Sequence, residues 1–262
     1  MSNIVVRALS GAVYVAALIG CALWSPYAMS ILFLMVMLLA SHEFKNMTKG
    51  DSGILLWALP TYLFYTMFVL HGYVSSSSYL LFLFPIVHAA YSVIKLKDAQ
   101  QMLYTCAGAV LYIALPLASV IDLHVSMISG LIVPFFIMIW ANDTGAYLVG
   151  RAIGKTKLAP KISPKKTIEG LVGGIIFCIA TALITSYFIP ELSIANAIGI
   201  AVVVGIFSNI GDLFESALKR IVGVKDSGHL FPGHGGFLDR FDSVIFAAPA
   251  TLIYIKAIYP WL

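Results

Sequence analysis

The residues best suited to chemistry lie in three polar stretches of the C-terminal half of this 262-residue chain. One stretch carries four polar residues at the spacing i, i+3, i+4 and i+7, which predicts one polar stripe on a helix: Asp212, Glu215, Ser216 and Lys219. Mg2+ usually binds one or two carboxylates and completes its shell with water and substrate phosphates. The two carboxylates therefore predict a metal site. A solvated helix end is the alternative, but it does not explain why Asp212 lies so close to an apolar run.

A second stretch, KDSGHLFPGHGGFLDRFDS, runs from Lys225 to Ser243 and is rich in glycine. Glycine lets backbone amides approach a ligand closely, and successive amides in such turns form an anion-binding nest. His229 and His234 lack the spacing of a zinc site, but His234 within this nest is a candidate contact for a phosphate. Asp239 and Asp242 then bring carboxylates back to the start of the last apolar segment.

The third stretch, WANDTGAYLVGRAIGKTKLAPKISPKKTIEG, places Asn142 and Asp143 inside an apolar segment, where an ionisable residue is costly and usually functional. Asp143, Tyr147 and Arg151 are spaced i, i+4, i+8, which predicts one helical face. The alternative is that Asp143 pairs with Arg151 and locks two helices together. Six basic residues lie between positions 151 and 166. This loop either binds a polyphosphate or acts as a topology signal with affinity for anionic lipid.

Together the three stretches offer carboxylates for a divalent metal, many cations and an amide-rich loop. Catalysis of phosphoryl and nucleotidyl transfer consists mostly of positioning and of neutralising charge on phosphate oxygens. The residues therefore indicate a phosphate-transfer enzyme, and no hydrolytic triad or redox motif in the sequence competes with this interpretation.

The elements that must position these residues are membrane helices. The apolar content of the chain is 60%, well above the roughly 45–50% of soluble domains, and its mean hydropathy is +0.95. A span needs about 20 mostly apolar residues, and each is expected to be helical because lipid offers its backbone amides no other partner. The sequence predicts an all-α integral membrane protein, a polytopic bundle of about nine transmembrane helices at residues 4–24, 26–41, 54–71, 79–94, 104–120, 127–149, 171–189, 194–211 and 244–259.

The placement of charge predicts the orientation of the bundle. With the N-terminus in the cytoplasm, nine crossings leave 15 of the 16 Lys and Arg residues on the cytoplasmic side, as the positive-inside rule requires. All three polar stretches then lie at that face. We expect N-terminal helices over residues 1–120 and C-terminal helices with catalytic loops over residues 121–262. In the first part, we interpret His42, Glu43 and Lys45 as markers of the water boundary.

The segment SALKRIVGVKDSGHLFPGHGGFLDRFD, Ser216 to Asp242, resembles the signature of the phosphatidate cytidylyltransferase (CDP-diglyceride synthetase) family, bacterial type. It has the serine, the Lys-Arg pair, the Lys-Asp pair and the closing HGG and DR-apolar-D patterns without a departure. The upstream stretch is similar as well, so that the resemblance spans residues 135–245. It implies a nucleotidyltransferase of phospholipid biosynthesis, which converts CTP and phosphatidate to CDP-diacylglycerol and pyrophosphate at the cytoplasmic face of the bacterial inner membrane.

The resemblance also implies roles for individual residues. Asp212 and Asp239 would hold the catalytic metals, Mg2+ with a monovalent cation such as K+, and Glu215 would support them. Lys219 and Arg240 would act in catalysis by screening the charge of two phosphate-bearing substrates. The residues expected to bind substrate are Asn142, Asp143, Ser163, Lys165, Lys166, Ser216, Arg220, Lys225, Asp226, His234, Gly235 and Gly236. No strong general base is required, because the phosphatidate oxygen is already an anion near neutral pH.

The expected partners are CTP, phosphatidate, the lipid bilayer and a second copy of the chain in a homodimer, without nucleic acid. A CTP-dependent polyprenol or dolichol kinase is the nearest alternative, but its hydroxyl nucleophile would benefit from a base. A transporter is a further alternative, and transporters usually place polar residues near the bilayer midplane in both halves of the chain. Here the polar residues lie in one half, which favours the cytidylyltransferase.

Overall fold

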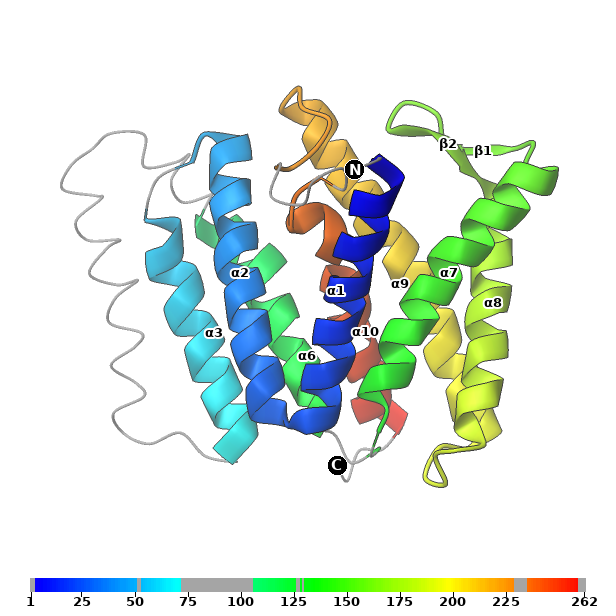
Figure 1. Cartoon of the computed structure of the whole chain (residues 1–262), viewed down its shortest axis with the longest axis horizontal. Coiled ribbons are helices and arrows are strands. Elements are labelled where there is room, and N and C mark those ends of the chain that lie inside the picture. Colours follow the sequence, from blue (N-terminus) through cyan, green and yellow to red (C-terminus); the bar gives the residue numbers. More distant parts are fainter. Residues whose placement is uncertain are drawn as a thin grey trace. The chain divides into compact units, whose positions relative to one another are not determined.

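The described part of the chain is built from long helices (Figure 1). The computed structural model describes residues 3–50, 53–71, 106–125, 128, 130–228 and 235–258. Its α-helices are α1 (Asn3–Trp24), α2 (Pro26–Thr48), α3 (Ile54–His71), α6 (Leu115–Val125), α7 (Ile132–Ile153), α8 (Ile168–Ser186), α9 (Ile194–Ile221) and α10 (Leu238–Ile258). A π-helical turn, Ala109–Ala114, precedes α6. The helical class predicted from the sequence is confirmed.

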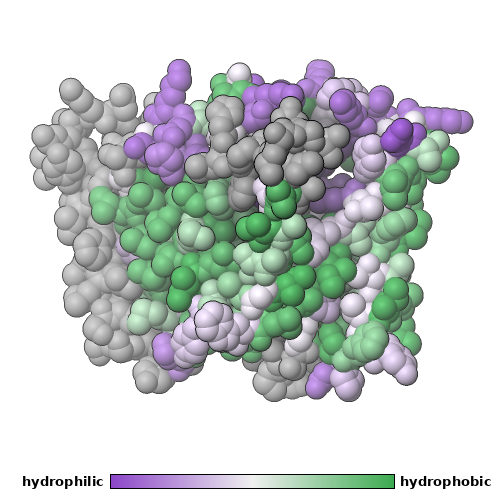
Figure 2. Space-filling view, viewed as in Figure 1, coloured by the Kyte–Doolittle hydropathy of each residue, from purple (hydrophilic) through white to green (hydrophobic). Residues whose placement is uncertain are grey.

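Seven helices of the described residues are long and apolar enough to cross a membrane: α2, α3, the stretch Cys106–Val125, and α7 to α10. Figure 2 shows hydrophobic side chains over the body of the helices and hydrophilic ones gathered near helix ends. Large apolar side chains face outward, as in α8, where Ile176 is 57% and Ile184 is 65% exposed. Such surface suits lipid rather than water, so the chain is a multi-pass membrane protein. The predicted span 79–94 lies outside the described residues, and the number nine and the orientation stay predictions.

The chain divides into two compact units. The first unit holds residues 1–125 and 226–240, and within it α3 packs against α2 and α6. The second unit holds residues 126–225 and 241–262, and within it α7, α8 and α9 pack against one another. The division into domains at residue 120 stays a prediction.

Local sequence explains where two helices of the second unit begin. Thr167 accepts the amide of Gly170 at 3.1 Å and caps α8, and Ser193 accepts the amide of Asn196 at 3.2 Å and caps α9. A hydroxyl at this position satisfies one of the first amides, which have no partner within the helix. The start of each of these two helices is therefore set by the threonine or serine directly before it.

Three elements differ from the sequence-based expectation. The helix predicted at 26–41 continues to Thr48, so His42 to Lys45 are helical. The last helix begins at Leu238 rather than 244, which places Asp239 to Asp242 in its first turn and a half. The basic loop forms a hairpin of two antiparallel strands, β1 (Lys157–Ala159) and β2 (Ser163–Thr167), in a chain expected to be all α.

Candidate functional site

The polar stripe predicted on one helix is present on α9. Ser216 donates its hydroxyl to Asp212 at 3.3 Å, and Lys219 pairs with Glu215 at 2.7 Å. Both contacts join residues four apart, as neighbours on one helical face should. Glu215 is 1% exposed, so its carboxylate is held inside the protein with the ammonium group of Lys219 as its counter-ion.

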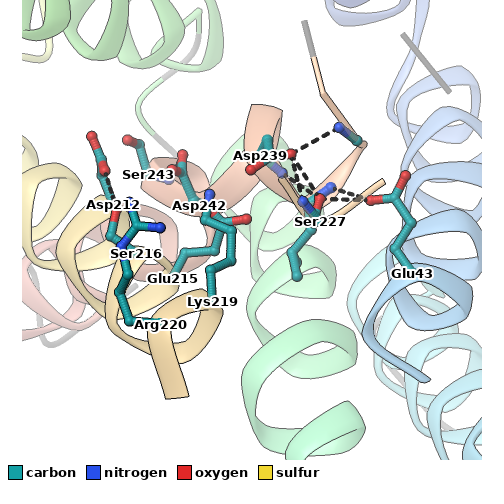
Figure 3. Close-up of polar contacts among 12 residues, drawn as sticks. Glu43, Asp212, Glu215, Ser216, Lys219, Arg220, Ser227, Asp239, Asp242 and Ser243 are labelled. Carbon is teal, nitrogen blue, oxygen red and sulfur yellow. Dashed lines mark hydrogen bonds and ion pairs between the residues drawn. The ribbon is translucent and has the colours of Figure 1, made fainter. Parts of the chain in front are cut away.

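A close crossing of α9 and α10 adds a third carboxylate (Figure 3). Gly211 lies against the backbone carbonyl of Asp242, where any side chain at position 211 would collide with it. One residue further along α10, Ser243 donates its hydroxyl to the carbonyl of Ser208 at 3.3 Å. This crossing brings the carboxyl group of Asp242 within electrostatic range of those of Asp212 and Glu215.

Asp242 was given no individual role from the sequence, although its DR-apolar-D pattern stood in the quoted signature. The pattern did not reveal that a glycine on α9 lets the two backbones meet at this residue. Asp143, on α7, also lies within electrostatic range of Asp242. The second unit therefore gathers four acidic residues from three helices, with Lys166 and Lys219 paired to two of them.

The hairpin β1–β2 brings basic residues to this acidic group. The ammonium group of Lys166, on β2, lies 2.7 Å from a carboxylate oxygen of Asp212. Glu169, in the first turn of α8, holds the base of the hairpin by accepting the amides of Lys155 and Thr156 at 3.1 Å each. The hairpin is therefore tied to α8 by a carboxylate and to α9 by an ion pair.

A pocket of about 380 Å3 lies among these elements of the second unit. This volume falls within the roughly 300–1,000 Å3 that small-molecule sites enclose. The pocket combines three cationic side chains with two carboxylates, and its lining consists of Asp143, Ala146, Tyr147, Gly150, Arg151, Leu158, Lys165, Lys166, Thr167, Gly170, Leu171, Asn209 and Asp212. Arg151 donates to the hydroxyl of Tyr147 at 3.2 Å, one turn away on α7. The face predicted for Asp143, Tyr147 and Arg151 is thus the wall of a pocket.

Asn142 does not line this pocket, although the sequence placed it with Asp143. Its side chain is 1% exposed and accepts the side-chain amide of Asn209 on α9 at 3.2 Å. Gly174 on α8 leaves the room that the Asn142 side chain occupies. Asn142 therefore joins three helices behind the pocket, and Asn209 extends from it into the lining.

Asp239, in the first unit, has a different environment (Figure 3). One oxygen of its carboxylate accepts the amide of Gly236 at 2.8 Å and both the amide and the hydroxyl of Ser227 at 2.9 Å. The amide of Gly236, predicted to bind an anion, is thus bound to a carboxylate of the protein itself. Asp239 thus holds Ser227 and Gly236 of the glycine-rich stretch together at the start of α10.

Glu43 was interpreted as a marker of the water boundary, and this interpretation is wrong. Its side chain on α2 is 3% exposed, and its carboxylate accepts the amides of Phe237 and Leu238 at 2.9 and 3.0 Å and the hydroxyl of Ser227 at 3.0 Å. His42 beside it is exposed, as a boundary residue should be. A charged group in the second half of a long apolar helix was the signal that could have identified Glu43.

The remaining residues that were predicted to bind substrate do not lie together in one of the two units. Arg220 is exposed and its Nε lies 3.5 Å from the carbonyl of Ile162 in the hairpin turn, and Ser163 begins β2 without lining the pocket. Lys225 and Asp226 are exposed, and Gly235, in the turn before α10, has a positive φ of 81°. Arg240, which was predicted to act in catalysis, is exposed in the first turn of α10. His234 lies outside the described residues.

The shared metal site of Asp212 and Asp239 stays a prediction. The two residues belong to different compact units. Within the described ranges, no group of three or more His, Cys, Asp or Glu side chains is arranged to hold a metal ion.

Comparison with known proteins agrees with the chemistry of these residues. The sequence matches the cytidylyltransferase family over residues 5–258. Proteins named phosphatidate cytidylyltransferase from Staphylococcus haemolyticus, Staphylococcus aureus and Staphylococcus epidermidis are 47%, 48% and 50% identical over 121 residues, which is 46% of this chain and 46% of each relative. The chain thus spans about half the length of the curated relatives it matches. Since the family match covers nearly all of the helices that carry these carboxylates and lysines, the chain belongs to the cytidylyltransferase family.

Proposed function

We propose that this protein is a phosphatidate cytidylyltransferase, which transfers the cytidylyl group of CTP to phosphatidate and releases pyrophosphate. The observation that carries the proposal is the pocket in which Arg151, Lys165 and Lys166 lie together with Asp143 and Asp212. Membership of the family and the names of the similar staphylococcal proteins support it. The resemblance of the segment from Ser216 to Asp242 to the family signature supports it further.

The cations of the pocket suit a triphosphate. Arg151 comes from the last turn of α7 and the two lysines from β2, so they approach from two elements of the second unit. An arginine can bind phosphate oxygens through two parallel N–H bonds, and a lysine contributes a compact positive charge. Charge of this kind lowers the cost of bringing a second phosphate-bearing substrate to the nucleotide.

The oxygen donors of Asp212, Glu215 and Asp242 suit Mg2+, which prefers carboxylate and water ligands. In this structure, the positive charge beside two of them comes from Lys166 and Lys219. We propose Asp212 and Asp239, with Glu215 in support, as the residues that would hold Mg2+ and a monovalent cation such as K+, with water and substrate phosphates completing the shell of Mg2+. When bound, the cations would neutralise charge on the phosphate oxygens.

In the reaction, an oxygen of the phosphatidate phosphate attacks the α-phosphorus of CTP. The bond between that phosphorus and the oxygen bridging to the β-phosphate breaks, and the electron pair leaves with pyrophosphate. Lys166 lines the pocket and contacts Asp212, so its ammonium group is available to either a carboxylate or a phosphate. Because the nucleophile is already an anion, the protein must neutralise charge but does not need a base to remove a proton.

The substrate is a lipid, and the protein is a multi-pass membrane protein, so both substrates can meet only at a membrane surface. We propose that this surface is the cytoplasmic face of the bacterial inner membrane, because CTP is made in the cytoplasm and nearly all Lys and Arg residues fall on that side in the predicted topology. The homodimer is proposed on the family resemblance alone.

The test uses the purified full-length chain in liposomes with phosphatidate, Mg2+ and CTP labelled at either the α- or the γ-phosphate. Label from the α-position in the chloroform-soluble fraction, with γ-label released as pyrophosphate, is the expected result. In a parallel reaction with a polyprenol in place of phosphatidate, transfer of γ-label to the polyprenol, with no α-label entering lipid in the first reaction, would instead identify a lipid kinase and refute the proposal.

A further inference from the structure

Glu43 is a buried charge that the proposed reaction does not use directly. It lies on α2, far in the sequence from every residue of the proposed site, and is 3% exposed. A carboxylate without compensating hydrogen bonds is very costly to bury. Its partners therefore indicate why this position carries an acid instead of an apolar residue.

The partners of Glu43 all belong to the segment that precedes and starts α10. Phe237 donates its amide to one carboxylate oxygen, and Leu238 and Ser227 donate to the other, across 184 to 195 positions of sequence. Phe237 and Leu238 supply amides at the N-terminus of α10, where the helix itself offers no acceptor. The carboxylate of α2 thus caps α10 from outside, in the position that the helix dipole favours for a negative charge.

Two glycines make this approach feasible. At both Gly228 and Gly236, a Cβ atom would collide with the carboxylate of Glu43. Gly228 does not have a positive φ, so its lack of a side chain is needed for the space that Glu43 occupies rather than for the backbone conformation. These glycines therefore form part of the binding site for Glu43.

Ser227 connects Glu43 to Asp239. Its hydroxyl lies 3.0 Å from Glu43 and 2.9 Å from Asp239, and its single hydrogen can be donated to only one of them at a time. The same oxygen of Asp239 is also bound by the amide of Gly236, next to the amides that Glu43 accepts. A change at Glu43 would therefore alter the donors that orient Asp239.

We propose that Glu43 is a positioning residue of this enzyme, which anchors the signature segment to α2 and thereby orients Asp239. The claim that Glu43 orients Asp239 for catalysis rests on the proposed function. The claim that Glu43 anchors the segment to α2 rests on the hydrogen bonds alone. Glu43 itself contacts no substrate in this assignment. It acts through Ser227 and the first amides of α10.

The decisive variant is Glu43→Gln, which keeps the size of the side chain. A glutamine has one acceptor oxygen and one NH2 donor, so in either orientation an N–H group faces the amide of Phe237 or that of Leu238. Glu43→Asp keeps two acceptor oxygens on a shorter chain and is expected to recover part of the loss. His42→Gln, at the exposed neighbouring position, is the matched control.

Hydrogen exchange of the full-length protein tests the anchoring. In Glu43→Gln, the amides of Phe237 and Leu238 should exchange roughly 10- to 100-fold faster, the range expected for loss of a bond to a charged acceptor. Glu169→Gln, which removes the carboxylate that accepts the amides of Lys155 and Thr156 in the second unit, should speed exchange at Lys155 and Thr156 only. Unchanged exchange at Phe237 and Leu238 in a folded Glu43→Gln protein would overturn the proposal.

Kinetics test the link to Asp239. For Glu43→Gln we expect kcat to fall roughly 10-fold or more with the KM for CTP within about threefold, because the nucleotide pocket lies on other elements. Partial recovery in Glu43→Asp supports positioning, whereas equal loss in both variants with a normal exchange pattern refutes it. If the wild-type protein transferred no label, the proposed function would fall, while the exchange experiment would still decide whether Glu43 anchors the segment.

Discussion

The contact between Lys166 and Asp212 leads to a prediction in which stability and activity separate. The side chains of this ion pair are 22% and 37% exposed, respectively, and lie 2.7 Å apart. Pairs with this much exposure contribute about 0–1 kcal/mol to stability, since solvent screens them. We therefore expect Lys166→Ala to lower the melting temperature in detergent by no more than about 4 °C.

The same substitution should impair catalysis far more. If the ammonium group of Lys166 neutralises charge that develops on the transferring phosphate, its removal should cost about 3–4 kcal/mol, or a 100- to 1,000-fold loss in kcat/KM. The effect on stability is expected to be small because solvent screens the ion pair in the protein without substrate. The effect on kcat/KM is expected to be large because the pocket holds a polyphosphate during the reaction.

The assay measures transfer of α-label from CTP to phosphatidate in liposomes, with the melting temperature measured on the same preparation. Lys161→Ala is the matched control, because Lys161 lies in the turn of the same hairpin, is exposed and does not line the pocket. Its activity should remain within about threefold of wild type, as expected of a screened surface charge. Retention of more than a tenth of the activity by Lys166→Ala would refute the assignment of Lys166 to the phosphates.

The other predictions concern single positions. Asp239→Asn should abolish turnover while the protein still inserts into membranes, and an active variant would remove Asp239 from the metal site. Lys45→Ala should be nearly silent in the transfer assay, so a large loss would show that this charge of α2 takes part in the chemistry. Gly211→Ala should destabilise the protein by about 1–3 kcal/mol in thermal unfolding, because its Cβ meets the carbonyl of Asp242. Gly20→Ala on α1, where nothing lies within 4 Å, should leave stability equal or slightly higher, and equal effects at both glycines would contradict the close crossing.

The helices and the stripe on α9 could be predicted because each depends on neighbours in the sequence. An apolar run long enough to span lipid must be helical, and residues at i, i+3, i+4 and i+7 must share a face. The pairing of Ser216 with Asp212 and of Lys219 with Glu215 confirms this kind of inference. The hairpin was missed because the local sequence, with its prolines and lysines, shows no alternation of apolar and polar residues. What holds it is Glu169, which accepts amides 13 and 14 positions earlier in the chain.

Glu43 shows where inference from local sequence fails. By its neighbours it is a charge near the end of an apolar run, and a water boundary is the simplest explanation. Its actual environment depends on amides nearly 200 positions downstream, which no local pattern can indicate.

The glycines at 228 and 236 were misleading for the same reason. Their spacing is typical of an amide nest for a ligand anion, and amides of this segment do bind anions. The anions are the carboxylates of Glu43 and Asp239, both supplied by the chain itself. A glycine-rich segment beside a proposed phosphate site can therefore have its amides already occupied by the protein. Under the proposed function, Asp239 would bind a metal ion that contacts the substrate phosphates. The orientation of its side chain would then depend on Glu43, through the hydroxyl of Ser227.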